Sequence, residues 1–389
     1  MGKLARMRAT RALVHLENFK ANVSSIKKLL SPKTMLCASV KADAYGHGAV
    51  QCAKKALEAG ASYLSVATVD EGRQLREAGI TCPILMLSLC SLGEVEEAVR
   101  LDLTPFVCDT EYAASFDRSC AAQGKRDYPV HLAVDTGMGR LGCRPESAGD
   151  VAGELCALSH LHLAGTATHF AMSDCMGDEG RAYTKEQLAR FLLSIENIKR
   201  AGVDPGICHA ANSAAALALP EARLDMVRAG IWMYGCLAGD ISPSYMSSTG
   251  YPVELLPVMT VQSEISCVKP FKKGECAGYG CTWSAPHDTN VAVLPIGYAD
   301  GWLRRFATSG VKVACQGKTY PLVGRICMDQ CMIDVGTTDV PPRGSTVTLF
   351  GLASDGASQT VDDVARLVGT ISYEVTCGIS KRVPRVYVD

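Results

Sequence analysis

Short apolar segments alternate with amphipathic ones through the first 240 residues, and this alternation limits the possible folds more than any other feature of the chain. The apolar segments have the length of β-strands and are residues 34–40, 62–66, 83–88, 103–108, 130–135, 162–169, 208–212 and 224–228. Between them, residues 19–30, 50–59, 69–78 and 184–201 carry apolar side chains three and four positions apart, which indicates helices. Eight strand–helix units predict a (β/α)8 barrel, and an open doubly wound sheet fits the same periodicity.

The pattern changes after a segment rich in Ser, Pro and Gly, GDISPSYMSSTGYP, at residues 239–252. The segments beyond it are short, β-rich and bounded by turn residues: VMTVQSEISCVK, NVAVLPIGYA, GVKVACQGKTYPLV, CMIDVG and STVTLFG. VDDVARLVG is the clearest helix candidate among them. Because 389 residues exceed what one core usually supports, we predict a barrel domain over residues 1–240 and a mostly β domain over residues 241–389.

The charge and hydropathy of the chain exclude several classes of partner. Lys and Arg number 39 against 40 Asp and Glu, so neither nucleic acid nor an anionic membrane surface is an expected partner. The N-terminal stretch has no apolar core of a signal peptide, and no apolar run is long enough to span a membrane. We therefore expect a soluble, cytoplasmic protein that acts on a small molecule.

Eighteen cysteines are spread singly through apolar segments such as MLCASV and CPILMLSLC. This pattern is typical of free thiols used as small core residues in a reducing compartment. The closest spacings, Cys276 with Cys281 and Cys327 with Cys331, lack a CxxC pair or flanking histidines. A zinc site is therefore not expected.

Lys41 is the first candidate for chemistry, since it leaves the apolar segment MLCASV and enters DAYGHG. Catalytic groups of a barrel lie at the C-terminal ends of its strands, where a lysine can form an imine. Tyr45 follows with a phenol, and MVRAGIWMYG places Arg228, Gly230 and Ile231 after the eighth strand, where barrels often bind phosphate. These residues favour a ligand that bears a phosphate, although a lysine at a strand end can equally be structural.

Two further clusters are weaker when each is taken alone. VDTGMGRLG carries Asp135 and Arg140 around a Gly-rich loop, and these residues could serve as a turn cap and a surface ion pair. GYGCTW carries Tyr279 in the β-rich half, where most tyrosines are packing residues. Neither cluster identifies a reaction by itself.

Taken together and in order, these segments closely resemble the alanine racemase family. The resemblance runs from about residue 10 to residue 385 and rests on SVKADAYGHG, VDTGMGRLG, ATHFAMSD, ANSAA, MVRAGIWMYG, GYGCTW, PIGYADGW, GRICMDQ and SYEVTCGISKRVPR. It implies a fold-type III pyridoxal-phosphate enzyme with an N-terminal barrel, a C-terminal β domain and head-to-tail homodimers. It also implies a small amino acid as substrate.

The resemblance implies a role for each matching residue. Lys41 matches the lysine that binds the cofactor covalently and acts as one base, and Tyr279 matches the second base, offered together with Met328 from the other subunit. Arg228 matches the partner of the pyridine nitrogen. The other matching positions are Tyr45, Ser213, Gly230, Ile231 and Tyr373 around the phosphate, His169 beside the ring, Arg140 near the substrate carboxylate, and Tyr298 on the approach to the site.

The sequence departs from the family pattern at two positions. Many relatives have a carbamylated lysine two residues before the DTG aspartate, where this chain has Ala133, so Arg140 needs another support. Lys381 replaces a residue that is often tyrosine. The departure at Ala133 leaves serine or a broader set of amino acids open as substrates.

The predicted reaction is two-base racemisation of alanine, which would supply D-alanine for peptidoglycan. Inversion at an α-carbon needs acid/base groups on both faces, and lysine and tyrosine suit this once their pKa values are lowered. Arg228 cannot release its proton, so it disfavours a protonated pyridine nitrogen and limits delocalisation of the carbanion. The alternatives are a pyridoxal-phosphate amino-acid decarboxylase and a non-catalytic carrier of the cofactor, which would need only the barrel.

Overall fold

The computed structural model describes residues 8–249, 255–353 and 357–389, and its N-terminal half is a barrel. The barrel strands are β2 (Met35–Ser39), β3 (Tyr63–Val66), β4 (Ile84–Met86), β5 (Leu103–Val107), β6 (Tyr128–Ala133), β7 (Leu161–Ala167), β8 (Ile207–His209) and β9 (Met226–Ala229). All pairs are parallel, in the order β8-β7-β6-β5-β4-β3-β2-β9. Two backbone hydrogen bonds link the ends of this order, from Asp225 N to Cys208 O (3.1 Å) and from Arg228 N to Ala211 O (3.0 Å). The predicted eight-stranded barrel is confirmed.

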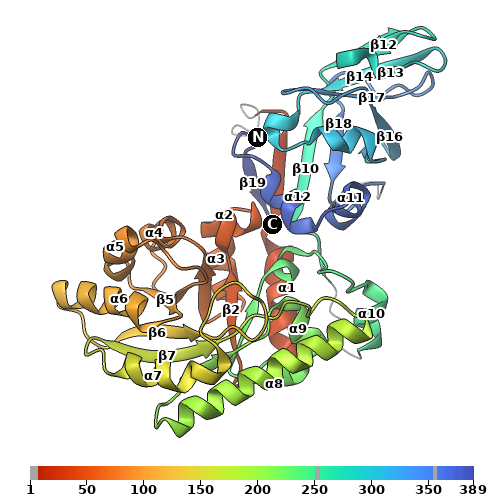
Figure 1. Ribbon diagram of the computed structural model, residues 1–389. Helices are drawn as coiled ribbons and strands as arrows, with labels where there is room; N and C mark the ends of the chain where they lie inside the picture. Colours follow the sequence, from red (N-terminus) through yellow and green to blue (C-terminus); the bar gives the residue numbers. More distant parts are fainter. Residues whose placement is uncertain (1–7, 250–254, 354–356) are drawn as a thin grey trace.

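Helices surround these strands (Figure 1). The barrel helices are α1 (Leu16–Leu29), α3 (Ala49–Glu58), α4 (Val69–Glu77), α5 (Val95–Arg100), α6 (Thr110–Ala122), α7 (Ala148–Cys156), α8 (Asp178–Arg200) and α9 (Ser213–Ala218). A capping box fixes the start of α4, because the Thr68 side chain accepts from Glu71 N while the Glu71 carboxylate accepts from Thr68 N. No helix in the described ranges is long and apolar enough to cross a membrane.

The interior of the barrel is a small apolar cluster separate from the main core. Its buried members come from six different strands and are Cys37, Leu85, Phe106, Ala133, Ala167 and Met226. Strands buried on both faces read as continuous apolar runs, and all five residues of β5 are buried. The interior also holds polar groups, since His131 on β6, His209 on β8 and Arg228 on β9 are all buried.

The C-terminal half is built on a nine-stranded sheet, as the β-rich pattern predicts. Its strands, in spatial order, are β11 (Cys267–Phe271), β14 (Thr289–Leu294), β17 (Cys331–Asp334), β16 (Lys318–Val323), β15 (Lys312–Cys315), β18 (Thr346–Phe350), β10 (Met259–Glu264), β1 (Arg11–His15) and β19 (Arg385–Val388). A two-stranded sheet of β12 (Cys276–Ala277) and β13 (Trp283–Ser284) forms the far tip of this half (Figure 1). Two helices, α11 (Val361–Val368) and α12 (Ser372–Gly378), complete it.

The first strand of the chain belongs to this C-terminal sheet. β1 pairs antiparallel with β10 and parallel with β19, so the N-terminal residues cross from one half to the other. The division into domains of residues 1–240 and 241–389 stays a prediction. β1 lies within residues 1–240 in the sequence but pairs with strands of the C-terminal half. The predicted linker contains the helix α10 (Pro243–Ser248), and its residues 250–252 lie outside the described part of the chain.

Candidate active site at the barrel mouth

Lys41 begins an unusual turn at the C-terminal end of β2. α2 (Lys41–Tyr45) is left-handed, with φ of 52°, 53°, 54° and 54° at Ala42, Asp43, Ala44 and Tyr45. Such a conformation costs an L-residue roughly 1–2 kcal/mol. Consecutive residues adopt it only where their surroundings enforce it, so this turn is held by the rest of the fold.

Hydrogen bonds from three directions hold the turn. Ala42 N donates to Glu71 Oε1 (2.7 Å), and Asp43 Oδ1 accepts from Ala49 N (2.8 Å) at the start of α3. The ring of His47 lies 2.9 Å and 3.0 Å, through Nδ1, from the carbonyl oxygens of Ala44 and Tyr45. This contact makes Nδ1 the protonated nitrogen, and burial lowers the pKa of His47 to about 4.

The C-terminal half packs on the same turn through two glycines. A Cβ on Gly46 (φ 85°) would lie 2.3 Å from Thr376 O, and one on Gly48 (φ 101°) would lie 2.0 Å from the Tyr387 hydroxyl. Both positions therefore require glycine, for their backbone conformation and for the close approach. The packing of the C-terminal half beside Lys41 thus explains the two glycines of the segment DAYGHG.

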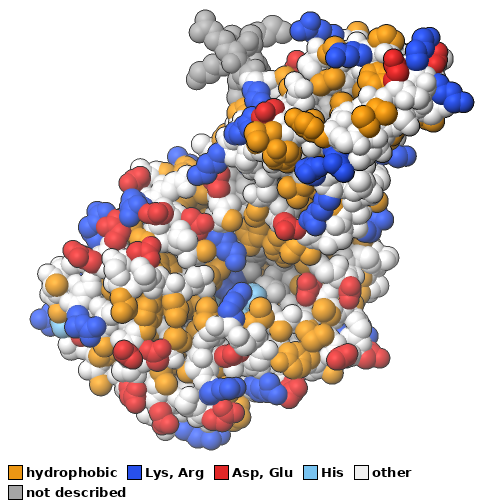
Figure 2. All heavy atoms as spheres, turned by 45° about the horizontal axis from the view of Figure 1, so that its top comes forward, with side chains coloured by type: hydrophobic (Ala, Val, Ile, Leu, Met, Phe, Trp, Pro, Cys, Tyr) orange, Lys and Arg blue, Asp and Glu red, His pale blue; other side chains and the backbone are white. Residues whose placement is uncertain are grey.

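The ammonium group of Lys41 lies in a strongly cationic setting. Burial lowers the pKa of Lys41, the guanidinium groups of Arg140 and Arg228 lower it further, and Glu71 partly opposes them. Figure 2 shows basic side chains and a histidine gathered in the hollow between the two halves. Two connected cavities open here, and both are lined by Lys41, Leu87, His169 and Arg228.

The first cavity, of about 130 Å³, is surrounded by hydroxyl groups and backbone amides. Its lining includes Ser39, Tyr45, Ser213, Gly230, Ile231 and Tyr373. Gly230 N donates to Ser213 Oγ (2.8 Å), and a Cβ on Gly230 would lie 2.9 Å from the Tyr45 hydroxyl. This arrangement brings together, around one space, the residues that the resemblance assigns to a phosphate.

Two buried histidines in the barrel interior, hydrogen-bonded in series, hold Arg228 in place. Its Nη1 lies 2.7 Å from His209 Nδ1, and His209 Nε2 lies 2.8 Å from His131 Nδ1. Since arginine only donates, His209 accepts at Nδ1, donates from Nε2 to His131, and leaves the His131 proton on Nε2, for which no partner is found among the described residues. Burial and the charge of Arg228 lower the pKa of both histidines, to about 3 for His131.

The same arginine also holds the rim of the cavity. Its Nη2 donates to Thr168 O (2.7 Å) and lies 3.3 Å from His169 Nδ1. Burial lowers the pKa of Arg228 to about 10, which leaves it charged at neutral pH. Burial and the cations Arg228, Arg140 and Lys41 lower the pKa of His169 to about 3, so its ring is neutral.

The second cavity, of about 240 Å³, lies beside Ala133 and Arg140. Ala133 is buried in the barrel interior, whereas Arg140 is exposed. Within the described ranges no hydrogen bond or ion pair holds the Arg140 side chain, and Asp135 is engaged with Gly137 N and Gly139 N (3.0 Å each). The support that a lysine at position 133 would give is therefore not replaced by another described side chain.

Tyr279 and its expected companions lie elsewhere. Tyr279 lies in the turn between β12 and β13 and is 69% exposed, and Met328 is 52% exposed in the same shallow depression. Tyr298 is also exposed, at 40%, as is Lys381. Of the described side chains, those that line the two cavities at the barrel mouth do not include Tyr279, Met328 or Tyr298.

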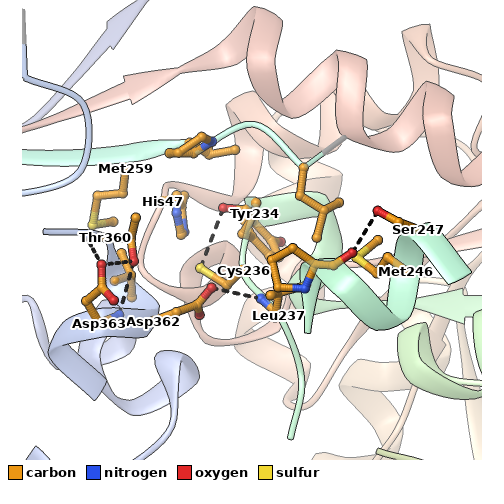
Figure 3. Close-up of a pocket in the computed structure, with 16 residues that line it drawn as sticks. His47, Tyr234, Cys236, Leu237, Met246, Ser247, Met259, Thr360, Asp362 and Asp363 are labelled. Atoms are coloured by element: carbon orange, nitrogen blue, oxygen red, sulfur yellow. Dashed lines mark hydrogen bonds between the residues drawn. The ribbon is translucent and has the colours of Figure 1, made fainter. Parts of the chain in front are cut away.

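A larger cavity, of about 900 Å³, lies at the junction of the two halves and fits this ligand less well. Figure 3 shows His47 and Tyr234 on its wall, with Asp362 and Asp363 opposite. Asp362 accepts from Leu237 N (3.2 Å) and Asp363 takes part in the cap of α11, so both carboxylates are structural. Two carboxylates line this cavity and none of the described lysines or arginines does, which disfavours a phosphate there.

Sequence reasoning missed the histidine chain and the left-handed turn. His131 and Ala133 share a face of β6 by the period of two, so His131 could have been assigned to the barrel interior. The turn has no such signal, because Ala42, Asp43 and Ala44 are ordinary helix or loop residues.

The chain is similar to alanine racemases along its whole length. The family described as "Alanine racemase, N-terminal domain" matches residues 14–238, and "Alanine racemase, C-terminal domain" matches residues 258–387. The alanine racemase of Treponema denticola is 44% identical over 98% of this chain and 99% of its own, and that of Desulfovibrio desulfuricans is 42% identical over 97% and 98%. The solved structure of alanine racemase from Bacillus anthracis with bound L-Ala-P is 36% identical, with a TM-score of 0.89 over 98% of this chain and 96% of that one. With both domain models matched in order and with relatives at this identity over nearly the full length, the chain belongs to the alanine racemase family.

Proposed function

We propose that this protein interconverts L- and D-alanine with pyridoxal phosphate as cofactor. The observation that carries the proposal is the meeting of Lys41, Arg228 and a ring of hydroxyl groups around one cavity in a chain of this family. Lys41 and Arg228 line both this cavity and the one connected to it, and Arg140 lines the second, so the two together suit a ligand with a phosphate and a carboxylate.

The residues present fit the cofactor. Tyr45, Ser213 and Tyr373 offer hydroxyl groups to a phosphate, and Gly230 and Ile231 offer backbone close to it. Lys41 offers an amine whose lowered pKa favours the neutral, nucleophilic form. When bound, pyridoxal phosphate withdraws electrons from the substrate and so makes its α-proton acidic.

Arg228 would contact the ring nitrogen of the cofactor. Its other donors are used by Thr168, His209 and Ala210, so the guanidinium group cannot turn away. A fixed cation at this position disfavours a proton on a neighbouring nitrogen. Such restraint suits a racemase, because a carbanion that is less delocalised is reprotonated before side reactions occur.

Lys41 would move a proton on one face of the substrate, and Tyr279 from a second copy of the chain would do so on the other. The support for a second copy is that Tyr279 and Met328 are exposed in this chain and lie outside its own barrel cavities. We therefore propose a homodimer whose active sites are each shared by both chains. Tyr298 would line the approach to this site.

Alanine is the proposed substrate, with Arg140 near its carboxylate. A cytoplasmic enzyme that supplies D-alanine for peptidoglycan is the proposed cellular role. The free state of the described cysteines is consistent with a reducing compartment.

The test is an assay of the purified protein, loaded with pyridoxal phosphate, against a panel of L-amino acids. We expect D-alanine to form faster than any other D-amino acid, without release of carbon dioxide. Faster turnover of serine or of many amino acids would assign a broader racemase, and carbon dioxide release would assign a decarboxylase. Binding of the cofactor without turnover of any amino acid would contradict the proposal.

A further inference from the structure

Residues 41–46, called here the Lys41 turn, are bound by a charged side chain at each end. At the start, the Glu71 carboxylate accepts a hydrogen bond from Ala42 N (2.7 Å). At the end, Arg385 Nε donates to the carbonyl oxygen of Gly46 (2.9 Å) across 339 positions of sequence. Arg385 is the first residue of β19, which lies beside α2 (Figure 1), and it is not among the residues for which the sequence predicts a role.

Every carbonyl oxygen of residues 42–46 accepts a hydrogen bond. Backbone amides and the ring of His47 serve the first four. The fifth belongs to Gly46, which is buried, and among the described residues Arg385 alone donates to it. Because a buried carbonyl group without a donor is costly, this contact fixes the end of the turn.

The guanidinium group of Arg385 is itself held by the segment that precedes it. Its Nη1 donates to Ser380 O (2.6 Å) and Val383 O (2.7 Å), and its Nη2 donates to Ile379 O (2.5 Å). With the bond to Gly46, four of its five N–H groups donate to carbonyl oxygens, which requires the planar, forked donor geometry of arginine. Arg385 therefore cannot turn away from the Lys41 turn without breaking three other hydrogen bonds.

The charge of Arg385 is also directed at the turn. Burial lowers the pKa of Arg385, and the negative charge of Asp43, a residue of the turn, opposes this effect. A cation in this position is favourable only while the turn keeps its present shape. Arg385 and the Lys41 turn thus depend on each other.

The shape of the turn decides where the Lys41 amine lies. The Lys41 side chain lines both cavities at the barrel mouth, and the four residues after it are left-handed. L-residues keep such a backbone only where their surroundings enforce it. If the end of the turn were released, these residues would return towards right-handed or extended backbone, and the Lys41 amine would be displaced from the cavities.

We propose that Arg385 is a positioning residue for Lys41. Through Gly46 it fixes the end of the left-handed turn, and the turn holds the Lys41 amine in the cavities that Arg228 also lines. The effect of Arg385 on turnover rests on the proposed function, in which Lys41 moves a proton. Its effect on the place of the Lys41 amine does not depend on which reaction the protein catalyses.

The experiment compares Arg385→Gln and Arg385→Lys with Arg366→Gln, a control at an exposed arginine of the same half. In the protein without cofactor, the pH dependence of Lys41 acetylation, followed by mass spectrometry of its peptide, gives the pKa of this amine. In Arg385→Gln we expect this pKa to rise towards the ordinary value of about 10.4, because a displaced amine is less buried and lies further from Arg140 and Arg228. Arg385→Lys should give a smaller rise, since one ammonium group cannot replace all four hydrogen bonds, and Arg366→Gln should give none.

Kinetics of the cofactor-loaded protein provide the second readout. The kcat for racemisation of alanine should fall about tenfold to a hundredfold in Arg385→Gln, since a misplacement of about 1 Å can cost this much in rate. The KM should change by about twofold or less, because Arg140, the expected contact of the substrate carboxylate, lies in a different loop. Both constants are calculated per folded molecule, with the folded fraction measured by circular dichroism, so a loss of stability alone moves neither.

Three results would overturn the proposal: a folded Arg385→Gln protein with the wild-type pKa at Lys41, a raised pKa with the wild-type kcat, or equal changes in the Arg366→Gln control. If Arg385→Gln does not fold, Arg385→Lys, which keeps the positive charge, decides by the same measurements. A wild-type protein that racemises no amino acid would contradict the proposed function alone. Acetylation of Lys41 would then still decide whether Arg385 positions this amine, because it needs neither cofactor nor substrate.

Discussion

The turn that carries Lys41 is fixed by contacts within its own chain, whereas the tip loop, residues 276–281, leaves Tyr279 exposed. The Lys41 turn is left-handed over four residues and is held by Glu71, His47 and the packing of Thr376 and Tyr387 on two glycines. The tip loop projects from a two-stranded sheet and leaves Tyr279 69% exposed. One candidate base is fixed by its own chain, and the other is presented to solvent.

This difference indicates which half of the site is complete. The barrel mouth already contains the amine, the hydroxyl groups and the fixed arginine in one place, so its geometry does not depend on a second chain. The tip loop exposes Tyr279, but none of the described cavities at the barrel mouth of its own chain is lined by that residue. The largest effects of mutation should therefore come from the barrel half, and the tip half should be testable only between chains.

The Lys41→Ala variant tests whether the barrel half depends on one amine. Racemisation should fall by about 10⁴-fold or more, since both the anchor of the cofactor and a general base are lost. The absorbance of covalently bound pyridoxal phosphate should disappear as well. Lys33→Ala, at an exposed lysine of the same domain, is the matched control. Alanine at position 41 cannot form an imine with the cofactor. A covalent adduct that borohydride still traps in this cavity would therefore refute the assignment of Lys41.

Mixed dimers test whether the tip half acts across chains. Lys41→Ala and Tyr279→Phe homodimers should each be nearly inactive. When equal amounts are unfolded and refolded together, random pairing should restore about a quarter of wild-type activity, because half of the dimers then contain one intact site of two. The measurement is D-alanine formation in dimers whose composition is verified by mass. Inactive mixed dimers would mean that both residues come from one chain.

Acid should weaken the barrel half before the tip half, because the buried histidines His47, His131 and His209 belong to the barrel side. The pKa of His131 is lowered to about 3 in the folded chain, against about 6.5 in the unfolded chain. Between these pH values the unfolded chain therefore binds a proton at this residue and the folded chain does not. The stability it contributes is present above pH 6.5 and is lost progressively as the pH falls towards 3. Between pH 6.5 and 5 each such histidine should cost about 2 kcal/mol of unfolding free energy.

The histidine prediction is checked by denaturant unfolding at several pH values and fixed protein concentration. His131→Gln should reduce the pH dependence by about one proton, while His287→Gln, at an exposed histidine beside the tip, should leave it unchanged. An equal pH dependence in the wild type and His131→Gln would show that His131 is not the group involved.

The smallest effect is expected at Ala133, where the barrel half lacks a support for Arg140. Ala133→Lys in the presence of bicarbonate should lower the KM for alanine by about fivefold or less, since an exposed arginine gains about 1 kcal/mol or less from a carboxylate-like partner. Ala133→Met fills the cavity without an amine and is the control. If the two variants have the same KM and the same response to added anions, Arg140 needs no such partner.

The features of this molecule that could be predicted from the sequence are those that leave a local pattern, such as the positions of the barrel strands. All eight barrel strands lie within two residues of their predicted starts, because a strand buried on both faces leaves an unbroken apolar run. The predicted segments 83–88 and 208–212 are longer than the strands β4 and β8 that form there, and β8 ends at His209 since Asn212 caps α9 through Ala215 N (2.9 Å). The start of α8 was also hidden, because residues 178–183 lack apolar spacing.

Long-range features could not be predicted from local patterns. The motifs place Lys41, Tyr45 and Arg228 in neighbouring strand ends, so a barrel alone is enough to bring them together. The left-handed turn, in contrast, depends on contacts with Glu71 and with Thr376 and Tyr387, which come from more distant parts of the chain.

The position of β1 has a consequence for how the protein is made. β1 lies in the sheet between β10 and β19, yet it leaves the ribosome some 240 residues before the first of these partners. At about 5–20 residues per second, the nascent chain carries an unpaired strand for tens of seconds while the barrel is completed behind it. An unpaired strand is a template for other chains, so protection of residues 11–15 during synthesis becomes a condition for obtaining the folded enzyme.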